Sequence, residues 1–224
     1  ELLLNDARPG LAEGEAMDLA HGDSFYSSAR VGVAEVSEMR DCDAVVISAG
    51  RGGSPEESRL DLLRDNVRIV DEIATQLRGA SGVLVVVTNP VDVMVRVATA
   101  ASGLPPSRVI GTGTMLDTAR LRQTLGLEFS VDPRSVHAQV VGEHGDSEVV
   151  LWSGARIGGA RLSSWSEWNE GWQEEVAERV RRAAYEIIRR KGATNHAIGL
   201  VTAARLRWVL RGAGRVVCVS RVPA

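Results

Sequence analysis

The fold is decided by two short apolar runs, DAVVIS at residues 43–48 and VLVVV at residues 83–87. Both are rich in β-branched residues, which is typical of strands buried on both faces of a parallel sheet. Between them, apolar residues recur at spacings of four and three: Leu63, Val67, Val70, Ala74 and Leu77. This spacing predicts a helix over about residues 59–78.

The same alternation extends in both directions along the chain. Leu2-Leu3-Leu4 reads as an earlier strand, and Asn89-Pro90 ends the strand at 83–87 and opens a helix over about 91–101. Alternating strands and helices predict a parallel α/β sheet with right-handed crossovers.

The pattern changes after about Gly111, so we expect two parts, residues 1–111 and residues 112–224. In the second part the sequence predicts helices at 116–125, around the apolar face of 176–188, and at 195–210. It predicts strands at 135–141, 148–152 and 216–219.

Composition excludes several classes of protein. The chain has 224 residues, 44% of them apolar, which is enough to bury a sizeable core. Its 26 Lys and Arg against 29 Asp and Glu form no basic block, which argues against nucleic acid or an anionic membrane as a partner. No apolar run approaches the roughly 20 residues of a membrane span, and from the first residues we expect no signal peptide. Cys42 and Cys218 lie far apart, and we expect buried thiols in a reducing cytoplasm.

Three residues of the second part could carry acid–base chemistry. His144 stands between glycines in GEHGDS, and histidine is the usual proton carrier near neutral pH. Asp117 and Arg120 are three apart and project from one helix face, where they could orient an imidazole and bind a substrate carboxylate. The plainer alternatives are a turn histidine and a helix-surface ion pair.

Three residues of the first part follow strands or a glycine-rich loop. Arg59 begins a helix after the loop 50–58, and a closing loop would deliver it to a substrate, although a solvated surface arginine is the plainer interpretation. Asn89 and Asp6 each follow a strand, where the carboxyl ends of parallel strands line a ligand crevice. No G-x-G-x-x-G, Walker loop, zinc cluster or G-x-S-x-G occurs, and we expect no metal.

Seven stretches, taken in order, resemble the L-lactate/malate dehydrogenase family, nearer to its bacterial lactate branch. They are ELLLND, GEAMDLAHG, SAGRGGSPEESRL, TNPVDV, VIGTGTMLDTARLR, SVHAQVVGEHGDS and KGATNHAIG. The resemblance implies a Rossmann-type doubly wound parallel sheet that binds NAD, followed by an α+β catalytic domain. It implies reversible hydride transfer between NADH and pyruvate or a related 2-oxo acid.

The resemblance also implies roles for single residues. His144 would carry the proton, Asp117 would orient it, and Arg59 would polarise the reacting carbonyl. The implied substrate-binding residues are Arg120, Asn89, Thr194, Gly53 and Ile198. The implied cofactor-binding residues are Asp6, Gly50, Arg51, Val87, Thr88 and Asn89. Arg122 and His137 match positions that bind fructose 1,6-bisphosphate between subunits of a homotetramer or dimer.

Two departures from the family pattern stand out. Gly53 occupies the position where lactate enzymes carry Gln and malate enzymes carry Arg. The family's first strand, its glycine-rich phosphate loop and its C-terminal helix have no counterpart in the chain. The absent strand is central in the expected order, so we expect two strands with unpaired inner edges, and residues 1–224 alone to bind NADH poorly and to be inactive.

The leading hypothesis is an NAD-dependent L-lactate dehydrogenase. A malate or bulkier 2-hydroxy-acid dehydrogenase is the alternative within the class. An inactive fragmentary homologue that serves as a binding module is the alternative outside it.

Overall fold

A computed structural model describes residues 1–25, 29–53, 58–166 and 168–223 of the chain. The strands of the first part are β1 (Leu2–Leu4), β2 (Val31–Val33), β3 (Ala44–Ile47), β4 (Val83–Val86) and β5 (Val109–Gly111). The helices of this part are α1 (Leu11–His21), α2 (Arg59–Gln76) and α3 (Val91–Ser102). From β3 onward strands and α-helices alternate as the sequence predicts, whereas a 3-10 helix at Val36–Asp41 connects β2 to β3. All pairings among these strands are parallel.

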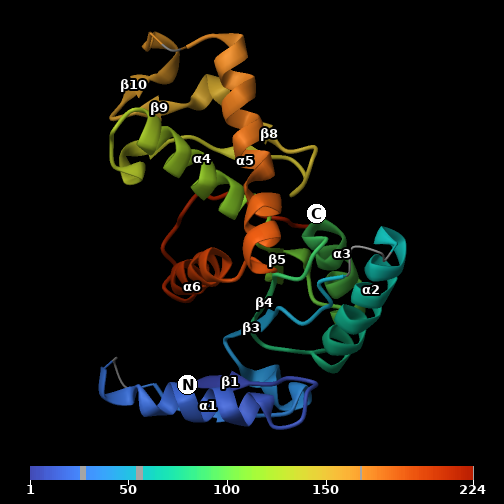
Figure 1. The fold of residues 1–224 in the computed structure, drawn as a ribbon. Helices are drawn as coiled ribbons and strands as arrows, with labels where there is room; N and C mark the ends of the chain where they lie inside the picture. The colour runs from blue at the N-terminus through green and yellow to red at the C-terminus, as the bar shows by residue number, and fades with distance from the viewer. Residues whose placement is uncertain (26–28, 54–57, 167, 224) are drawn as a thin grey trace.

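The parallel strands form two separate sheets, one of order β1-β2 and one of order β3-β4-β5. Among the described strands, β1 pairs with β2 alone and β3 with β4 alone. The predicted unpaired inner edges are therefore present. Figure 1 shows β1 and α1 together at one end of the molecule, apart from β4 and β5.

The core of the first part lies between the three-stranded sheet and two helices. α2 and α3 pack on each other, and α3 also packs on β4 and β5 (Figure 1). Val70 and Leu77 of the predicted helix face are fully buried there, together with Met94 of α3 and Leu84 of β4. In β4, Leu84, Val85 and Val86 are all buried, which explains its continuously apolar run, whereas in β3 Val45 and Ile47 are buried and Ala44 and Val46 are half-buried.

The second part is a helical layer over short strands. Its helices are α4 (Met115–Glu128), α5 (Glu170–Lys191) and α6 (His196–Leu210). Its strands are β6 (Val136–His137), β7 (Val140–Val141), β8 (Val149–Val150), β9 (Arg156–Ile157) and β10 (Ala160–Arg161). α4 packs against both α5 and α6, which flank it in Figure 1.

A cluster of partly buried aromatic side chains packs against the core of the second part. Trp152, Trp168 and Trp172 lie with ring centroids 5.6 to 6.2 Å apart, and Phe129 meets the edges of Trp165 and Trp172. These rings cover buried Leu125 on α4 and Val176 on α5. The tryptophan-bearing segment before α5 therefore packs against the core of the second part.

Three expectations from the sequence were wrong in detail. The predicted strand 135–141 is two strands, because β6 pairs with β9 whereas β7 pairs with β8. No strand forms at 216–219; this segment has a single bridge, from Ser220 to Gly111, and Val216 is 88% exposed because nothing packs on it. Cys42 and Cys218 are free thiols but only half-buried, since both lie outside the strands.

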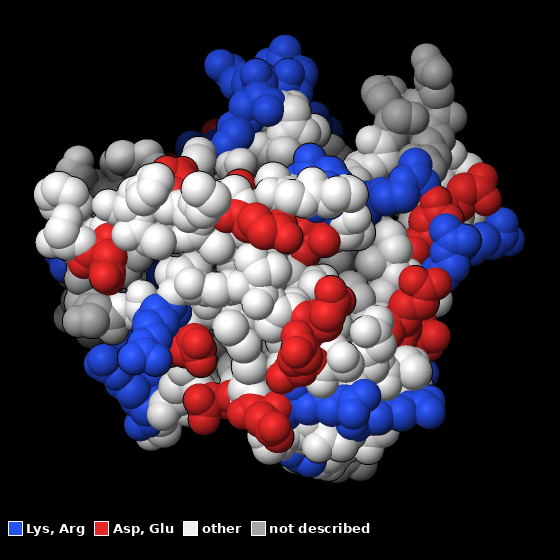
Figure 2. Space-filling model, turned by 90° about the horizontal axis from the view of Figure 1, so that it is seen from below, with Lys and Arg blue, Asp and Glu red and all other residues white. Residues whose placement is uncertain are grey.

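The surface carries charges of both signs. On the face that Figure 2 shows, acidic and basic groups alternate without a continuous field of one sign. In the part of the chain that the structure describes, no helix combines the length and apolar character needed to cross a bilayer.

Candidate functional site

A buried carboxylate on α4 holds the two other charged groups of the site. Asp117 has a side chain only 3% exposed. Its Oδ1 accepts a hydrogen bond from Nη1 of Arg120 at 2.7 Å, and its Oδ2 lies 2.6 Å from Nδ1 of His144. Arg120 is one helical turn away on the same face, as the spacing predicts. The burial of Asp117 distinguishes this pair from an ordinary helix-surface ion pair.

His144 lies in the connection between β7 and β8. Gly142 in this turn has φ +91°, a left-handed conformation that glycine adopts without steric cost. The backbone N–H of His144 donates to Oδ2 of Asp92 at 2.9 Å, and the other oxygen of Asp92 accepts from the hydroxyl of Ser220. Asp92 stands in the first turn of α3, so a helix of the first part fixes the histidine of the second.

The surroundings of His144 favour its charged form. The hydrogen bond to Asp117 raises the pKa of His144 above its usual 6.5, against the opposing effects of burial and of the nearby Arg120 charge. An ionised carboxylate only accepts hydrogen bonds, so Nδ1 of His144 carries a proton and Nε2 is left to exchange one. The His144 side chain is 23% exposed, so the ring is partly accessible.

The carboxyl ends of β3 and β4 are joined through Asn66 of α2, which is 2% exposed. Its side chain bonds both the N–H and the carbonyl of Arg51, at 2.7 and 3.2 Å, and the carbonyl of Asn89 at 3.0 Å. The hydroxyl of Thr88 donates to the carbonyl of Ala49 at 2.7 Å. The segments 49–51 and 87–89, which hold most of the predicted cofactor residues, therefore lie side by side.

Gly50 is required in this junction. A β-carbon on Gly50 would lie 2.6 Å from Cγ2 of Thr88 and 3.1 Å from Oδ1 of Asn66. The close approach of the two strand ends therefore depends on the missing side chain. Val87 is half-buried and Asn89 exposed, so this edge of the sheet is partly open to a ligand.

Asp6 follows β1 in the other sheet, and its side chain is 38% exposed. Its Oδ1 accepts a hydrogen bond from the backbone of Arg8 at 2.8 Å. The carboxylate thus stands at the end of a parallel strand and remains accessible, as the binding of two ribose hydroxyls requires. The residues present at these strand ends fit a dinucleotide.

For the other predicted substrate-binding residues the structure gives the position in the fold but fewer contacts. Thr194 and Ile198 are half-buried on either side of the α6 N-cap, and α6 packs on the helix that carries Asp117. Ser58 caps α2 by accepting from the N–H of Leu60, and Arg59 is the first residue of the helix, but its side chain is outside the described part. Gly53 is exposed with φ +74°, whereas residues 54–57 of its loop are outside the described residues.

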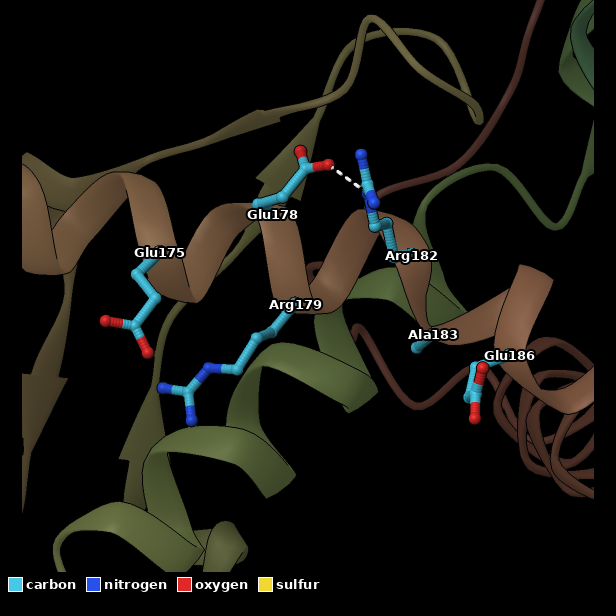
Figure 3. A pocket seen from close by; sticks show the side chains of 6 residues that line it. All are labelled: Glu175, Glu178, Arg179, Arg182, Ala183 and Glu186. Atoms are coloured by element: carbon cyan, nitrogen blue, oxygen red, sulfur yellow. Dashed lines mark hydrogen bonds and ion pairs between the residues drawn. The ribbon is translucent and has the colours of Figure 1, made fainter.

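Two further features, the predicted phosphate-binding residues and a groove on α5, are separate from the site around Asp117. Arg122 donates through Nε to the carbonyl of Ala138 at 3.0 Å, one residue after exposed His137. A groove along α5 is lined by Glu175, Glu178, Arg179, Arg182, Ala183 and Glu186, as Figure 3 shows. None of the predicted site residues lines that groove.

Sequence reasoning missed three polar residues that the fold brings to the site. In the sequence, Asp92 and Asn66 are ordinary polar residues of predicted helices. Only the structure shows that Asp92 binds the backbone of His144 and that Asn66 binds the backbone of Asn89. Glu148 is 6% exposed, with its carboxylate and the ligand atoms of Asp117 and His144 within 4.8 Å of one another. Asp117 already binds both Arg120 and His144. We therefore interpret Asp117, His144 and Glu148 as a cluster of proton-binding groups and not as a metal site.

Comparison with known proteins agrees with this geometry. Residues 1–111 match the lactate/malate dehydrogenase NAD binding domain, and residues 114–223 match the α/β C-terminal domain of the same family. The L-lactate dehydrogenase of Salinibacter ruber is 46% identical over 230 residues, which cover 100% of this chain and 73% of that protein. That of Gloeobacter violaceus is 48% identical, over 98% of this chain and 69% of that protein.

A solved structure extends the match to three dimensions. The minor L-lactate dehydrogenase of Enterococcus mundtii aligns with a TM-score of 0.95 at 39% identity, over 99% of this chain and 73% of that one. Fold and site thus define an NAD-binding, two-part α/β protein with a buried acid–imidazole pair. The chain belongs to the lactate/malate dehydrogenase family.

We expect Asp117→Asn to destabilise the protein more at pH 6 than at pH 9. The folded-state pKa of His144 lies above the usual 6.5, so the imidazolium–carboxylate bond stabilises the fold below that value. The contribution is lost as the pH rises through the raised pKa. The free energy of unfolding is measured by urea denaturation at both pH values.

The control is Asp132→Asn. Exposed Asp132 pairs with Arg134 and has a pKa lowered to about 2, so its charge is the same at pH 6 and pH 9. Its replacement should change stability equally at both. An equal loss at the two pH values for Asp117→Asn would contradict the assigned charge state of His144.

Proposed function

We propose that the protein is an NAD-dependent L-lactate dehydrogenase, which transfers hydride reversibly between NADH and pyruvate or a related 2-oxo acid. The observation that carries the proposal is the array in which one buried carboxylate, Asp117, holds both Arg120 and His144. Relatives named L-lactate dehydrogenase at 43–48% identity over nearly the whole chain support it.

The proton is moved by His144. Its Nε2 donates to the oxygen of the carbonyl as that oxygen becomes an alkoxide, and takes the proton back in the reverse direction. Asp117 keeps the ring in the tautomer with Nδ1–H and stabilises the imidazolium. Asp92 fixes the backbone of His144, so the ring is preorganised before substrate arrives.

Arg120 binds the substrate carboxylate. Its guanidinium has five N–H donors, of which Nη1 serves Asp117, and its side chain is 13% exposed. The remaining donors form a fork that matches a carboxylate. Asp117 thereby positions two functions of the reaction, the proton carrier and the anchor of the substrate.

The rest of the site is assigned from the resemblance. Arg59, delivered by the loop before α2, would polarise the carbonyl, and Asn89, Thr194, Gly53 and Ile198 would line the substrate pocket. Asp6, Gly50, Arg51, Val87, Thr88 and Asn89 would hold NAD, whose reduced form would supply the hydride and whose oxidised form would accept it in the reverse direction. The junction at Asn66 supports this assignment, because it holds two of these segments together.

Domain limits, assembly and location complete the proposal. Residues 1–111 form the dinucleotide-binding domain and residues 112–224 the substrate domain. The protein is a homotetramer or dimer, and Arg122 with His137 binds fructose 1,6-bisphosphate; the bond from Arg122 to the backbone of Ala138, one residue after His137, supports that site. Free Cys42 and Cys218 support a reducing compartment such as the cytoplasm.

We expect His144→Gln to lower kcat by about 10²–10⁴-fold, because glutamine fills the space but cannot carry a proton. NADH binding should stay nearly unchanged, since His144 is outside the strand ends that hold the cofactor. Turnover of NADH with pyruvate and NADH affinity by calorimetry are measured in protein expressed from the complete gene. His196→Gln, at an exposed histidine, is the control. Wild-type turnover in His144→Gln would overturn the function.

We expect pyruvate to be preferred over oxaloacetate by at least about tenfold in kcat/KM, because Gly53 offers no cation to a second carboxylate, whose unpaired burial is costly. Arg51 lies two residues upstream, but its guanidinium pairs with Asp65 and its N–H is held by Asn66. Arg51→Ala should therefore leave the preference unchanged, as should Arg64→Ala on the surface of α2. A wild-type preference for oxaloacetate that is lost in Arg51→Ala would favour a malate enzyme.

A further inference from the structure

A second carboxylic acid lies close to the imidazole of His144. Glu148 follows the His144 turn directly and precedes β8, and only 6% of the residue is exposed. Its carboxyl oxygen lies within 4.8 Å of the facing atoms of Asp117 and His144. Its Oε1 is buried and has no hydrogen-bond partner among the described residues. Glu148 has no role in the reaction as proposed above.

The groups that face Glu148 come from three elements. Asp117 and Arg120 project from α4, His144 from its own loop, and Arg181 from α5. Arg120 is paired with Asp117, and Arg181 is paired with Glu178 of its own helix. Glu148 therefore has neighbouring charges of both signs without an ion pair of its own.

Such a carboxyl group resists ionisation. Burial, and next the negative charge of Asp117, raise the pKa of Glu148 to about 7, with His144, Arg120 and Arg181 opposing the shift. The group therefore changes charge within the pH range in which a dehydrogenase of this kind would work. In the neutral form it is close in shape to a glutamine.

We propose that Glu148 is a positioning residue that acts on His144 through its charge: once ionised, it holds the imidazole in its protonated form. The proton itself passes between His144 and substrate, and Glu148 touches neither substrate nor cofactor. Two negative groups then lie near one imidazolium, Asp117 through a hydrogen bond and Glu148 through its charge alone. The consequence for turnover rests on the proposed function, whereas the effect on His144 does not.

The sign of the effect is set by which form of His144 reacts. Reduction of a 2-oxo acid needs the imidazolium, so its rate falls as the pH rises through the pKa of His144. Above about pH 7 the Glu148 carboxylate opposes the loss of that proton. Glu148 thus extends 2-oxo-acid reduction toward alkaline pH, and has no effect at acid pH, where it is neutral.

The direct test is NMR titration of the imidazoles in the full chain, which has four histidines: His21, His137, His144 and His196. We expect the midpoint of His144 to move to lower pH in Glu148→Gln and the other three to stay in place. The matched control is Glu143→Gln in the same turn, since Glu143 is exposed and bonded to Ser147. An unchanged His144 midpoint in Glu148→Gln would overturn the inference even if the protein is an active lactate dehydrogenase.

Kinetics provide the second readout. In Glu148→Gln, kcat/KM for pyruvate should equal the wild-type value at pH 6 and fall at least about fourfold below it at pH 8.5, which is the effect of one unit charge at roughly 5 Å even at the dielectric constant of water. Glu148→Met, which also removes the charge, should give the same alkaline limb if the glutamine variant folds poorly. An equal loss at both pH values would show a merely structural role and overturn the inference. These rates are measured, as for His144→Gln, in protein expressed from the complete gene, and absence of turnover in that wild-type protein would instead overturn the proposed function.

Discussion

The site depends on one carboxylate that has two partners. Asp117 is almost completely buried, and its two oxygens are divided between Arg120 and His144. A buried carboxylate is stable only when it is paired, and Asp117 is paired within α4 by Arg120 and with the turn after β7 by His144, so it links these two segments. The same pairing fixes the tautomer of the imidazole and the direction of the guanidinium. Proton transfer and substrate anchoring therefore have a common structural origin.

The two parts of the chain meet through polar contacts of the same kind. Asp92, at the start of α3, binds the backbone of His144 and the hydroxyl of Ser220, which is itself bridged to Gly111 at the end of β5. Asn66 joins the loops after β3 and β4 in a similar way. Because parallel strands bring their carboxyl ends to one edge, these buried hydrogen bonds place the cofactor segments on the side of the molecule that also holds the histidine.

Local periodicity was sufficient to predict most of the fold. The helix face from Leu63 to Leu77 and the runs at 43–48 and 83–87 were predictable, because burial of a helix stripe or a strand leaves a short-range pattern. Long-range events left no such pattern. The break between β6 and β7 depends on which strand pairs with which, and the isolated Gly111–Ser220 bridge depends on a single contact.

The same distinction between local pattern and long-range contact applies to the residues of the site. The resemblance located His144, Asp117 and Arg120, whereas Glu148 reads as a solvated acid until the fold shows it buried. The most direct test of the account is ¹⁵N NMR of the His144 ring across its titration. The account predicts that Nδ1 stays protonated beside Asp117 throughout and that Nε2 gains and loses the proton. Titration at Nδ1, with Nε2 protonated at high pH, would contradict it.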